Sequence, residues 1–303
     1  MRGILAVLAG VLCFSSSSSL VKWSDTNGAA VAFWRLFLSA VAWWAIIGVR
    51  WARTGQPAPS RATWRMMIPV AIFFGLNITM FFHAIQHTSI AHAEFIAALS
   101  PLVLVPAGAL LFGERPDGRA LWWGLVTILG LAIVLFSGGG GSEATLRGDV
   151  MIASVVVLWV GYLLTARRAR ATVGLVDFMA TLMNMAFLVA MPFTAVLAGN
   201  ALWSMSWKGW LVAAILSLLT GVVAHGMIAY AQKGVDVGTI GILQVAQPAI
   251  AVGWAYLILG EAIAPVQVPG MVLVVVGLVA FTVISQRRAT LAVTNRDGEL
   301  LRG

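Results

Sequence analysis

The sequence predicts an all-α integral membrane protein with ten transmembrane helices, arranged as two inverted five-helix repeats around a central cavity. Three observations lead to this fold class. The chain of 303 residues is 60% hydrophobic and only 10% charged, so one soluble core could not bury its apolar surface and lipid must solvate it. The apolar residues form ten long segments, and one stretch of the sequence occurs twice.

Each apolar segment is long enough to cross ~30 Å of hydrocarbon as a helix. Short polar stretches separate consecutive segments, so each one can enter and leave the bilayer. In chain order the segments cover residues 3–22, 29–50, 66–87, 89–112, 119–137, 148–167, 176–198, 208–232, 237–259 and 265–285.

The basic residues indicate how these segments are oriented. With the N-terminus in the cytoplasm, all of the 19 Lys and Arg residues lie on the cytoplasmic side except Lys22, Arg35, Arg147 and Lys208. The positive-inside rule therefore predicts that both termini are cytoplasmic. The net charge of +8 reflects this topology, so the lipid bilayer and not a nucleic acid is the expected partner.

The duplicated stretch is residues 84–134. A shift of the sequence against itself by 147 positions, without a gap, brings its Pro, Gly-Glu and Gly residues into register, which is hard to reach by chance. An odd number of spans per repeat makes the sixth span run opposite to the first, and inverted repeats are typical of transporters. The matched pairs are Ala84 and Ala231, Pro101 and Pro248, Leu110 and Leu257, Gly113-Glu114 and Gly260-Glu261, and Gly130-Leu131 and Gly277-Leu278.

The chain is therefore divided into four parts. Residues 1–137 form the first five-helix repeat and residues 147–285 the second. The Gly-rich run 138–146 between them is typical of a flexible external linker with no fold of its own. Residues 286–303 form a polar cytoplasmic tail, which we expect to be disordered.

Two charged residues fall inside the predicted spans, where charge is costly and usually faces a cavity or another helix. Arg35 and Glu94 lie at a similar depth, about 9 Å at ~1.5 Å per residue, so an ion pair between them is possible. The alternatives are a helix staple without a ligand and an Arg bound to carbonyl groups. The functional interpretation is a polar anchor beside the outer vestibule, with Glu94 taking up a proton.

The third span has two different polar faces. Thr79, His83 and Gln86 form a stripe on one face, whereas Asn77 lies among phenylalanines on the opposite face. One of these faces should line the pathway, and the sequence does not choose between them. His83 and His87 have a spacing that could suit a metal, but no carboxylate or cysteine accompanies them, so we expect a hydrogen-bonded pair, no metal site and no cofactor.

Proline occurs near the centre of the fourth and ninth spans. Pro101 and Pro248 each remove a backbone donor and free the carbonyl four residues earlier, at Ala97 and Gln244. Each span is therefore expected to be kinked at the membrane midplane and to act as a hinge. Packing alone is the competing explanation for such kinks.

Candidate substrate ligands are the polar and aromatic side chains of the spans that carry these features. Uncharged amides beside an indole suit a neutral or zwitterionic organic solute. The five serines Ser15–Ser19 in the first span are instead expected to be close-packing residues that bond back to their own helix. The candidate ligands are Asn77, His83, Ser100, Trp159, Tyr162, Gln244, Gln247 and Trp254.

Several motifs of other protein classes are missing. The glycine run at Gly138–Gly141 lacks the Lys-Ser or Lys-Thr that completes a Walker loop, so ATP is not expected to drive the protein directly. No Gly-x-Ser-x-Gly or His-Glu-x-x-His sequence is present, so an enzyme is not expected. A metal-dependent intramembrane enzyme built around His83, His87 and His92 remains a remote alternative.

Taken in chain order, these motifs resemble the EamA family of the drug/metabolite transporter superfamily, over roughly residues 1–285. Each repeat ends in Pro, a long apolar run, Gly-Glu and a Gly-containing last helix. The run CFSSSSSLVKW, which ends near Lys22, resembles the first helix of the family, and AFWRLFLSA, with Arg35, resembles the second. One departure is that Ala180, Thr181 and Leu182 occupy the region of the seventh span equivalent to Arg35, so the halves are chemically unequal.

The resemblance implies cytoplasmic termini, alternating access through a central cavity and export of small metabolites. Within the family, the aromatic-rich chain and His83 are most similar to bacterial inner-membrane exporters of aromatic amino acids. We therefore expect a secondary transporter that exports amino acids, with bulky apolar ones favoured. A carrier for multidrug or other metabolite efflux is the alternative, and the oligomeric state stays open.

Overall fold

The computed structural model describes residues 2–85, 87, 90–114, 117–137, 146–260 and 264–300. Within this part of the chain every regular element is helical. Eight helices or helix pairs are long and apolar enough to cross a membrane, and two shorter apolar stretches, Gly118–Val134 and Gln267–Phe281, complete the expected ten. The protein is therefore a multi-span membrane protein with the predicted fold class.

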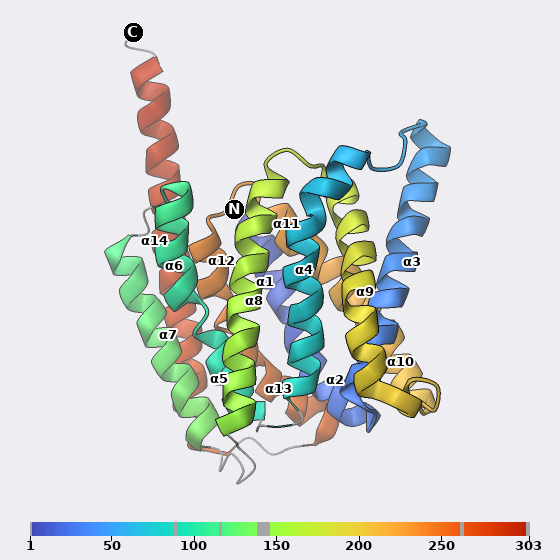
Figure 1. Cartoon of the computed structure of the whole chain (residues 1–303). Helices are drawn as coiled ribbons and strands as arrows, with labels where there is room; N and C mark the ends of the chain where they lie inside the picture. Colours follow the sequence, from blue (N-terminus) through green and yellow to red (C-terminus); the bar gives the residue numbers. More distant parts are fainter. Residues whose placement is uncertain are drawn as a thin grey trace.

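Five of the ten spans are single helices, and the other five comprise two or more helical elements. The first, fourth, eighth and ninth spans are interrupted, and a short 3₁₀ turn extends the seventh (Figure 1). In chain order the elements are α1 (Arg2–Ser15), α2 (Ser17–Ser24), α3 (Gly28–Thr54), α4 (Arg61–Ala84), α5 (Ile90–Ala98), α6 (Pro101–Phe112), α7 (Gly118–Ser137), α8 (Leu146–Arg170), α9 (Leu175–Ala198), η1 (Gly199–Leu202), α10 (Trp207–Leu216), η2 (Ser217–Ala224), α11 (His225–Ala231), α12 (Val237–Gln244), α13 (Gln247–Leu259) and α14 (Gln267–Leu300).

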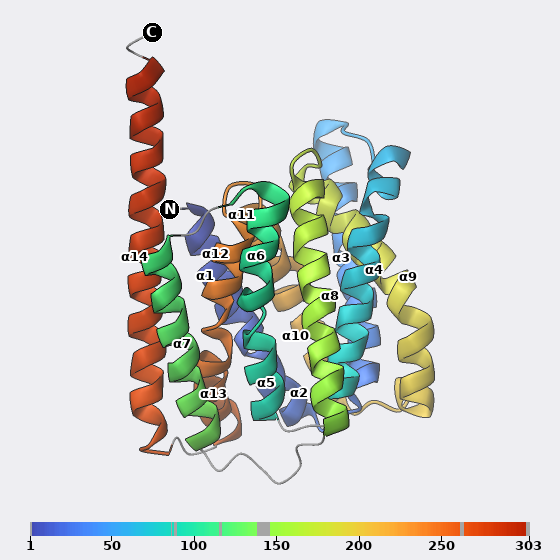
Figure 2. The ribbon, with the colours of Figure 1, turned by 60° about the vertical axis from the view of Figure 1, so that its left-hand side comes forward.

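The two halves of the chain are inverted relative to each other. Helices α1 and α8, which begin the two halves, run in opposite directions in Figure 1 and Figure 2. Both termini lie at one end of the bundle, which we call the termini end, and the opposite end is called the far end. The inverted arrangement of the two halves, which the odd number of spans per repeat predicts, is therefore present.

The same interruption occurs in both halves. Helix α5 stops at Ala98 and α6 begins at Pro101, and in the second half α12 stops at Gln244 and α13 begins at Gln247, each within one residue of the position that the repeat offset of 147 gives. Each pair then ends on a glycine with positive φ, 68° at Gly113 and 70° at Gly260, a conformation that costs glycine little because it has no Cβ. The sequence repeat is therefore a repeat of backbone conformation.

The last spans of the two halves, α7 and α14, pack along each other (Figure 2). A Cβ atom placed on Gly130 would lie 2.8 Å from the Gly270 carbonyl oxygen, and one on Gly270 would lie 2.7 Å from the Gly130 carbonyl oxygen. Gly277, the repeat partner of Gly130, is equally crowded by Thr127. Small residues allow such close backbone approach between membrane helices, where packing rather than the hydrophobic effect stabilises association.

The eighth span contains a π-helical stretch, η2, between α10 and α11. The wider turn leaves carbonyl groups that side chains of α3 satisfy: the Ser39 hydroxyl donates to the Ser217 carbonyl at 3.2 Å and the Trp43 indole N–H donates to the Gly221 carbonyl at 3.1 Å. Such π-helical turns are rare and occur frequently at functional sites.

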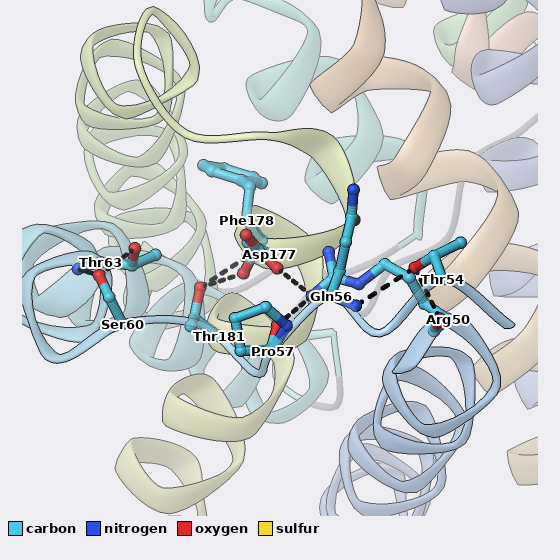
Figure 3. Close-up of polar contacts among 9 residues, drawn as sticks. All are labelled: Arg50, Thr54, Gln56, Pro57, Ser60, Thr63, Asp177, Phe178 and Thr181. Carbon is cyan, nitrogen blue, oxygen red and sulfur yellow. Dashed lines mark hydrogen bonds and ion pairs between the residues drawn. The ribbon is translucent and has the colours of Figure 1, made fainter. Parts of the chain in front are cut away.

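Polar groups also join α3 to α9 at the termini end. The Arg50 guanidinium lies 2.7 Å from the Asp177 carboxylate and donates to the Pro57 carbonyl at 2.9 Å (Figure 3). Asp177 lies in the first turn of α9, where the helix dipole favours a negative charge. This contact connects the two halves outside the membrane interior.

The last helix extends beyond the expected tenth span. Helix α14 continues through residues 286–300 of the polar tail to Leu300. A helix is favoured here because it continues the last span without a Gly or Pro break after Gly277 until Gly298. Residues 138–145 of the expected linker lie outside the described residues.

Candidate functional site

A cavity lies between the two halves, with a volume of about 140 Å³. This is far more than the ~10–15 Å³ that one water molecule needs. Its walls combine aromatic and aliphatic side chains with a few polar and charged ones. The lining residues are Phe14, Ser17, Ser18, Arg35, Asn77, Ile78, Phe81, Phe82, Glu94, Ala97, Ala98, Ser100, Val155, Val156, Trp159, His225, Gln244, Gln247 and Pro248.

Both intramembrane charges line this cavity. Arg35 on α3 is 4% exposed and Glu94 on α5 is 6% exposed. No ion pair joins them in the described part of the chain, where Arg35 instead places its guanidinium 5.5 Å from the centre of the Phe82 ring. The two groups thus line one cavity from different helices, and the ion pair that we considered possible is absent among the described residues.

The cavity settles which face of α4 points inward. Asn77, Ile78, Phe81 and Phe82 line it, and His83 does not. The Asn77 side-chain N–H₂ group donates to the Val155 carbonyl at 2.9 Å, so this amide also joins α4 to α8. Of the two faces left open by the sequence, the structure places the Asn77 face at the cavity.

Amide and indole groups also meet at the cavity. The Trp159 indole N–H on α8 donates to the Gln244 side-chain oxygen at 3.3 Å. Gln244 is the last residue of α12 and Gln247 the first of α13, so the interruption of the ninth span places both amides at the cavity. Ser100, at the equivalent interruption of the fourth span, also lines it.

His225 lines the cavity but was not a candidate in the sequence. Its side chain is 1% exposed, and neither ring nitrogen has a hydrogen-bond partner among the described residues. The ring contacts Phe14 and Phe74 with centroid distances of 4.6 and 4.7 Å. A histidine in a largely apolar span was the available signal, but His225 follows directly after the π-helical stretch, which the sequence did not reveal.

Four other candidates lie away from the cavity lining. The His83 ring contacts the His87 ring, with centroids 4.7 Å apart. The Tyr162 ring is fully buried behind Trp159, with centroids 5.0 Å apart. Pro101 starts α6 next to the lining residue Ser100, and the Trp254 indole N–H donates to the Ser15 hydroxyl at 3.1 Å.

The serines of the first span divide into two groups. Ser15 and Ser16 donate to carbonyl groups three residues earlier, at 2.7 and 2.8 Å, as expected for serines that bond back to their own helix. Ser17 and Ser18 follow at the start of α2 and line the cavity. These two were expected only to pack.

Replacing Trp254 with phenylalanine should lower thermal stability without changing solute affinity. The substitution removes the bond to Ser15, which corresponds to about 1 kcal/mol, but no cavity wall. Trp159→Phe should weaken solute binding, because that indole lines the cavity. Melting temperatures and competition binding of both variants, with the exposed Trp122→Phe as the control, test this contrast; equal losses of affinity in Trp254→Phe and Trp159→Phe would contradict it.

Polar contacts close the cavity toward the termini end, and those of Glu114 join the two halves. The Glu114 carboxylate accepts hydrogen bonds from the backbone N–H of Val237 at 3.1 and 3.3 Å, where α12 begins. The Arg167 guanidinium lies 3.9 Å from the same carboxylate and donates to the Gln232 carbonyl. Nearby, Arg170 Nε donates to the Ala229 carbonyl at 2.7 Å.

The environment of Glu114 disfavours its ionised form. Burial raises the pKa of this carboxyl, and the Asp236 carboxylate raises it further. Hydrogen bonds from the N–H groups of Val237 and Gly238 and the charge of Arg167 oppose this shift without cancelling it. On balance, the surroundings of Glu114 at the termini end raise the pKa of its carboxyl.

A second cavity, of about 430 Å³, continues from the first toward the far end. The two share Ser18, Phe81 and Glu94 in their linings. The second also includes residues 25–28, between α2 and the start of α3. In the described part of the chain, the central space is thus closed by polar contacts on one side and continues on the other.

A sequence profile of the EamA-like transporter family matches residues 1–136 and 146–283. The chain belongs to this family. The match covers both halves, and it agrees with the resemblance seen in the sequence motifs.

Known proteins similar to this EamA-like transporter include exporters. It is 26% identical over 294 residues to the pseudopaline exporter CntI of Pseudomonas aeruginosa (strain UCBPP-PA14), covering 92% of this chain and 95% of CntI. It is 25% identical over 220 residues to the threonine/homoserine exporter RhtA of Salmonella typhimurium (strain SL1344), covering 71% and 72% of the two chains. A solved crystal structure shares the fold, with a TM-score of 0.76, 21% identity and coverage of 94% and 98%.

Proposed function

We propose that this transporter exports amino acids, with bulky apolar ones preferred, by alternating access through the central cavity. The observation that carries the proposal is the cavity between inverted halves, closed by polar contacts at the termini end and continuing toward the far end. Its aromatic and aliphatic walls suit an apolar side chain. The similarity to a threonine/homoserine exporter supports an amino acid as the solute.

We propose further that the protein lies in a bacterial inner membrane with both termini in the cytoplasm. The distribution of Lys and Arg supports this orientation. On this basis the far end faces outward, and the structure represents an outward-facing state. The interruptions at Ser100 and at Ala246, next to Pro101 and Pro248, would then serve as hinges for the opposite state.

Uptake of labelled phenylalanine, leucine, threonine and homoserine into proteoliposomes tests the function. We expect flux above that of empty vesicles for at least phenylalanine and leucine, with cross-competition between the two. No flux and no competition for any of these four probes would remove the amino-acid proposal.

Efflux of organic cations is a second candidate, because Glu94 places a carboxylate at the cavity. Arg35 at the same cavity disfavours a simple cation, since it adds a like charge. Cells with Glu94→Gln should lose resistance to cationic dyes if this second function is correct. Unchanged resistance would count against it.

A further inference from the structure

Resting on the proposed amino-acid transport, we propose that Arg35 and Glu94 are a zwitterion-recognition site. Arg35 binds the α-carboxylate of the solute and Glu94 binds its α-ammonium group, while the aromatic wall takes the side chain. The site therefore requires both charged groups of a free amino acid. Solutes with only one of them bind weakly.

Inside the membrane, the charges of Arg35 and Glu94 carry an electrostatic cost. An unpaired charge away from water costs several kcal/mol, and intramembrane charges therefore usually pair with each other or with backbone carbonyls. In the described part of the chain, neither Arg35 nor Glu94 has an ion-pair partner, and Arg35 Nε is buried without a hydrogen-bond partner. Both groups therefore keep binding capacity that the protein itself does not use.

The side chains of Arg35 and Glu94 reach the same space. Arg35 and Glu94 come from different helices, α3 and α5, yet both line one cavity. A structural staple would bring them into contact, which the structure does not show. A space between two opposite charges suits a ligand that carries the complementary charges in the opposite order.

The rest of the lining carries no further charge. The remaining polar groups are hydroxyls, amides, one indole and one imidazole, and the remaining walls are apolar. With Arg35 and Glu94 ionised, the two charges cancel, so the cavity offers no net charge to a simple cation or anion. A zwitterion keeps the balance and gives each buried charge a partner, and its ammonium group stabilises the carboxylate form of Glu94.

The guanidinium is suited to its role, because its planar fork can donate two parallel hydrogen bonds to a carboxylate. The Phe82 ring under Arg35 holds the guanidinium by a cation–π contact without using its N–H donors. The carboxylate of Glu94 has only acceptor oxygens, which suits the three donors of an ammonium group.

The first experiment uses the wild-type protein in proteoliposomes and competition against labelled L-phenylalanine. Two analogues each lack one charge: 2-phenylethylamine lacks the carboxylate, and 3-phenylpropanoate lacks the ammonium group. We expect each to compete at least about tenfold more weakly than phenylalanine, equivalent to about 1.4 kcal/mol for each lost contact. Analogues that compete as well as phenylalanine would overturn the zwitterion site while leaving amino-acid transport intact.

The second experiment assigns each charge to its residue. Arg35→Met should strengthen competition by 2-phenylethylamine relative to phenylalanine by about tenfold or more. The reason is that this variant has no guanidinium to bind a carboxylate. Glu94→Gln should improve 3-phenylpropanoate relative to phenylalanine in the same way. Equal effects of both variants on both analogues would overturn the assignment.

Arg50→Met and Asp177→Asn are the matched controls. Arg50 is on the same helix as Arg35, and the Arg50–Asp177 ion pair lies outside the cavity lining (Figure 3). Both controls should keep the wild-type order of the three solutes. If phenylalanine itself shows neither flux nor competition in wild type, the proposed function fails, and this outcome differs from every result that concerns only the two charges.

Discussion

Replacing Gly130 with alanine should sharply reduce the amount of folded protein. The added Cβ would lie 2.7 Å from Leu273 Cβ and 2.8 Å from the Gly270 carbonyl oxygen, so α7 and α14 could not keep their present separation. Overpacking of this kind costs about 1–3 kcal/mol, and the crowding by backbone atoms leaves little room for relaxation. Melting temperature and monodispersity in detergent measure the effect.

The control is the same chemical change at Gly253 in α13, where an added Cβ meets no atom within 4 Å. Alanine is the better helix former there by about 1 kcal/mol, so Gly253→Ala should melt at or slightly above the wild-type temperature. If Gly130→Ala also matched the wild type, the close packing of α7 and α14 would not contribute to stability as described.

The second large effect concerns closure of the termini end. Because the closed state raises the pKa of Glu114, protonation of this carboxyl favours closure. This stabilisation is complete below the ordinary pKa of glutamate and is lost as the pH rises through the raised value. Opening of the termini end should therefore increase with pH in the wild type and become independent of pH in this range in Glu114→Gln.

Alkylation of Val237→Cys in a Cys13→Ala background measures this opening, since Val237 is fully buried in the closed state and Cys13 is the only native cysteine. Glu114→Ala should raise the alkylation rate by about tenfold at acidic pH, because the Val237 N–H then loses its acceptor. Lys233→Cys, at an exposed position, should react equally in all backgrounds, and dividing by its rate at each pH removes the ionisation of the thiol itself, because the thiolate is the reactive form. A pH dependence that persists in Glu114→Gln would assign it to another group.

Much of the fold could be predicted from the sequence because two kinds of signal were strong. The length and spacing of the apolar segments determined the ten spans. Proline and glycine restrict or permit particular backbone conformations, and Pro101 and Gly113 are separated from Pro248 and Gly260 by the same sequence offset. At these positions the structure shows equivalent helix interruptions and positive-φ glycines.

The site was less predictable, because it depends on the rotational phase of interrupted helices. Gln244, Gln247 and Trp254 would share a face on one continuous helix, but the turn at residues 245–246 changes the phase, and Trp254 packs against Ser15 instead. The choice between the Asn77 and His83 faces of α4 needed the positions of α8 and α9, which no local pattern contains. His225 was not predicted, because its place at the cavity also depends on the positions of other helices.

The π-helical stretch of the eighth span has a consequence for how the two copies diverged. Ala84 and Ala231 are 147 positions apart, but the close-packed glycines earlier in the same two spans, Gly75 and Gly221, are 221 − 75 = 146 apart. These glycines occupy equivalent places, since Gly75 packs on Ala186 of the seventh span and Gly221 on Ser39 of the second. The second copy therefore has one more residue than the first between these positions, and its helix accommodates the extra residue as a wider turn immediately before His225.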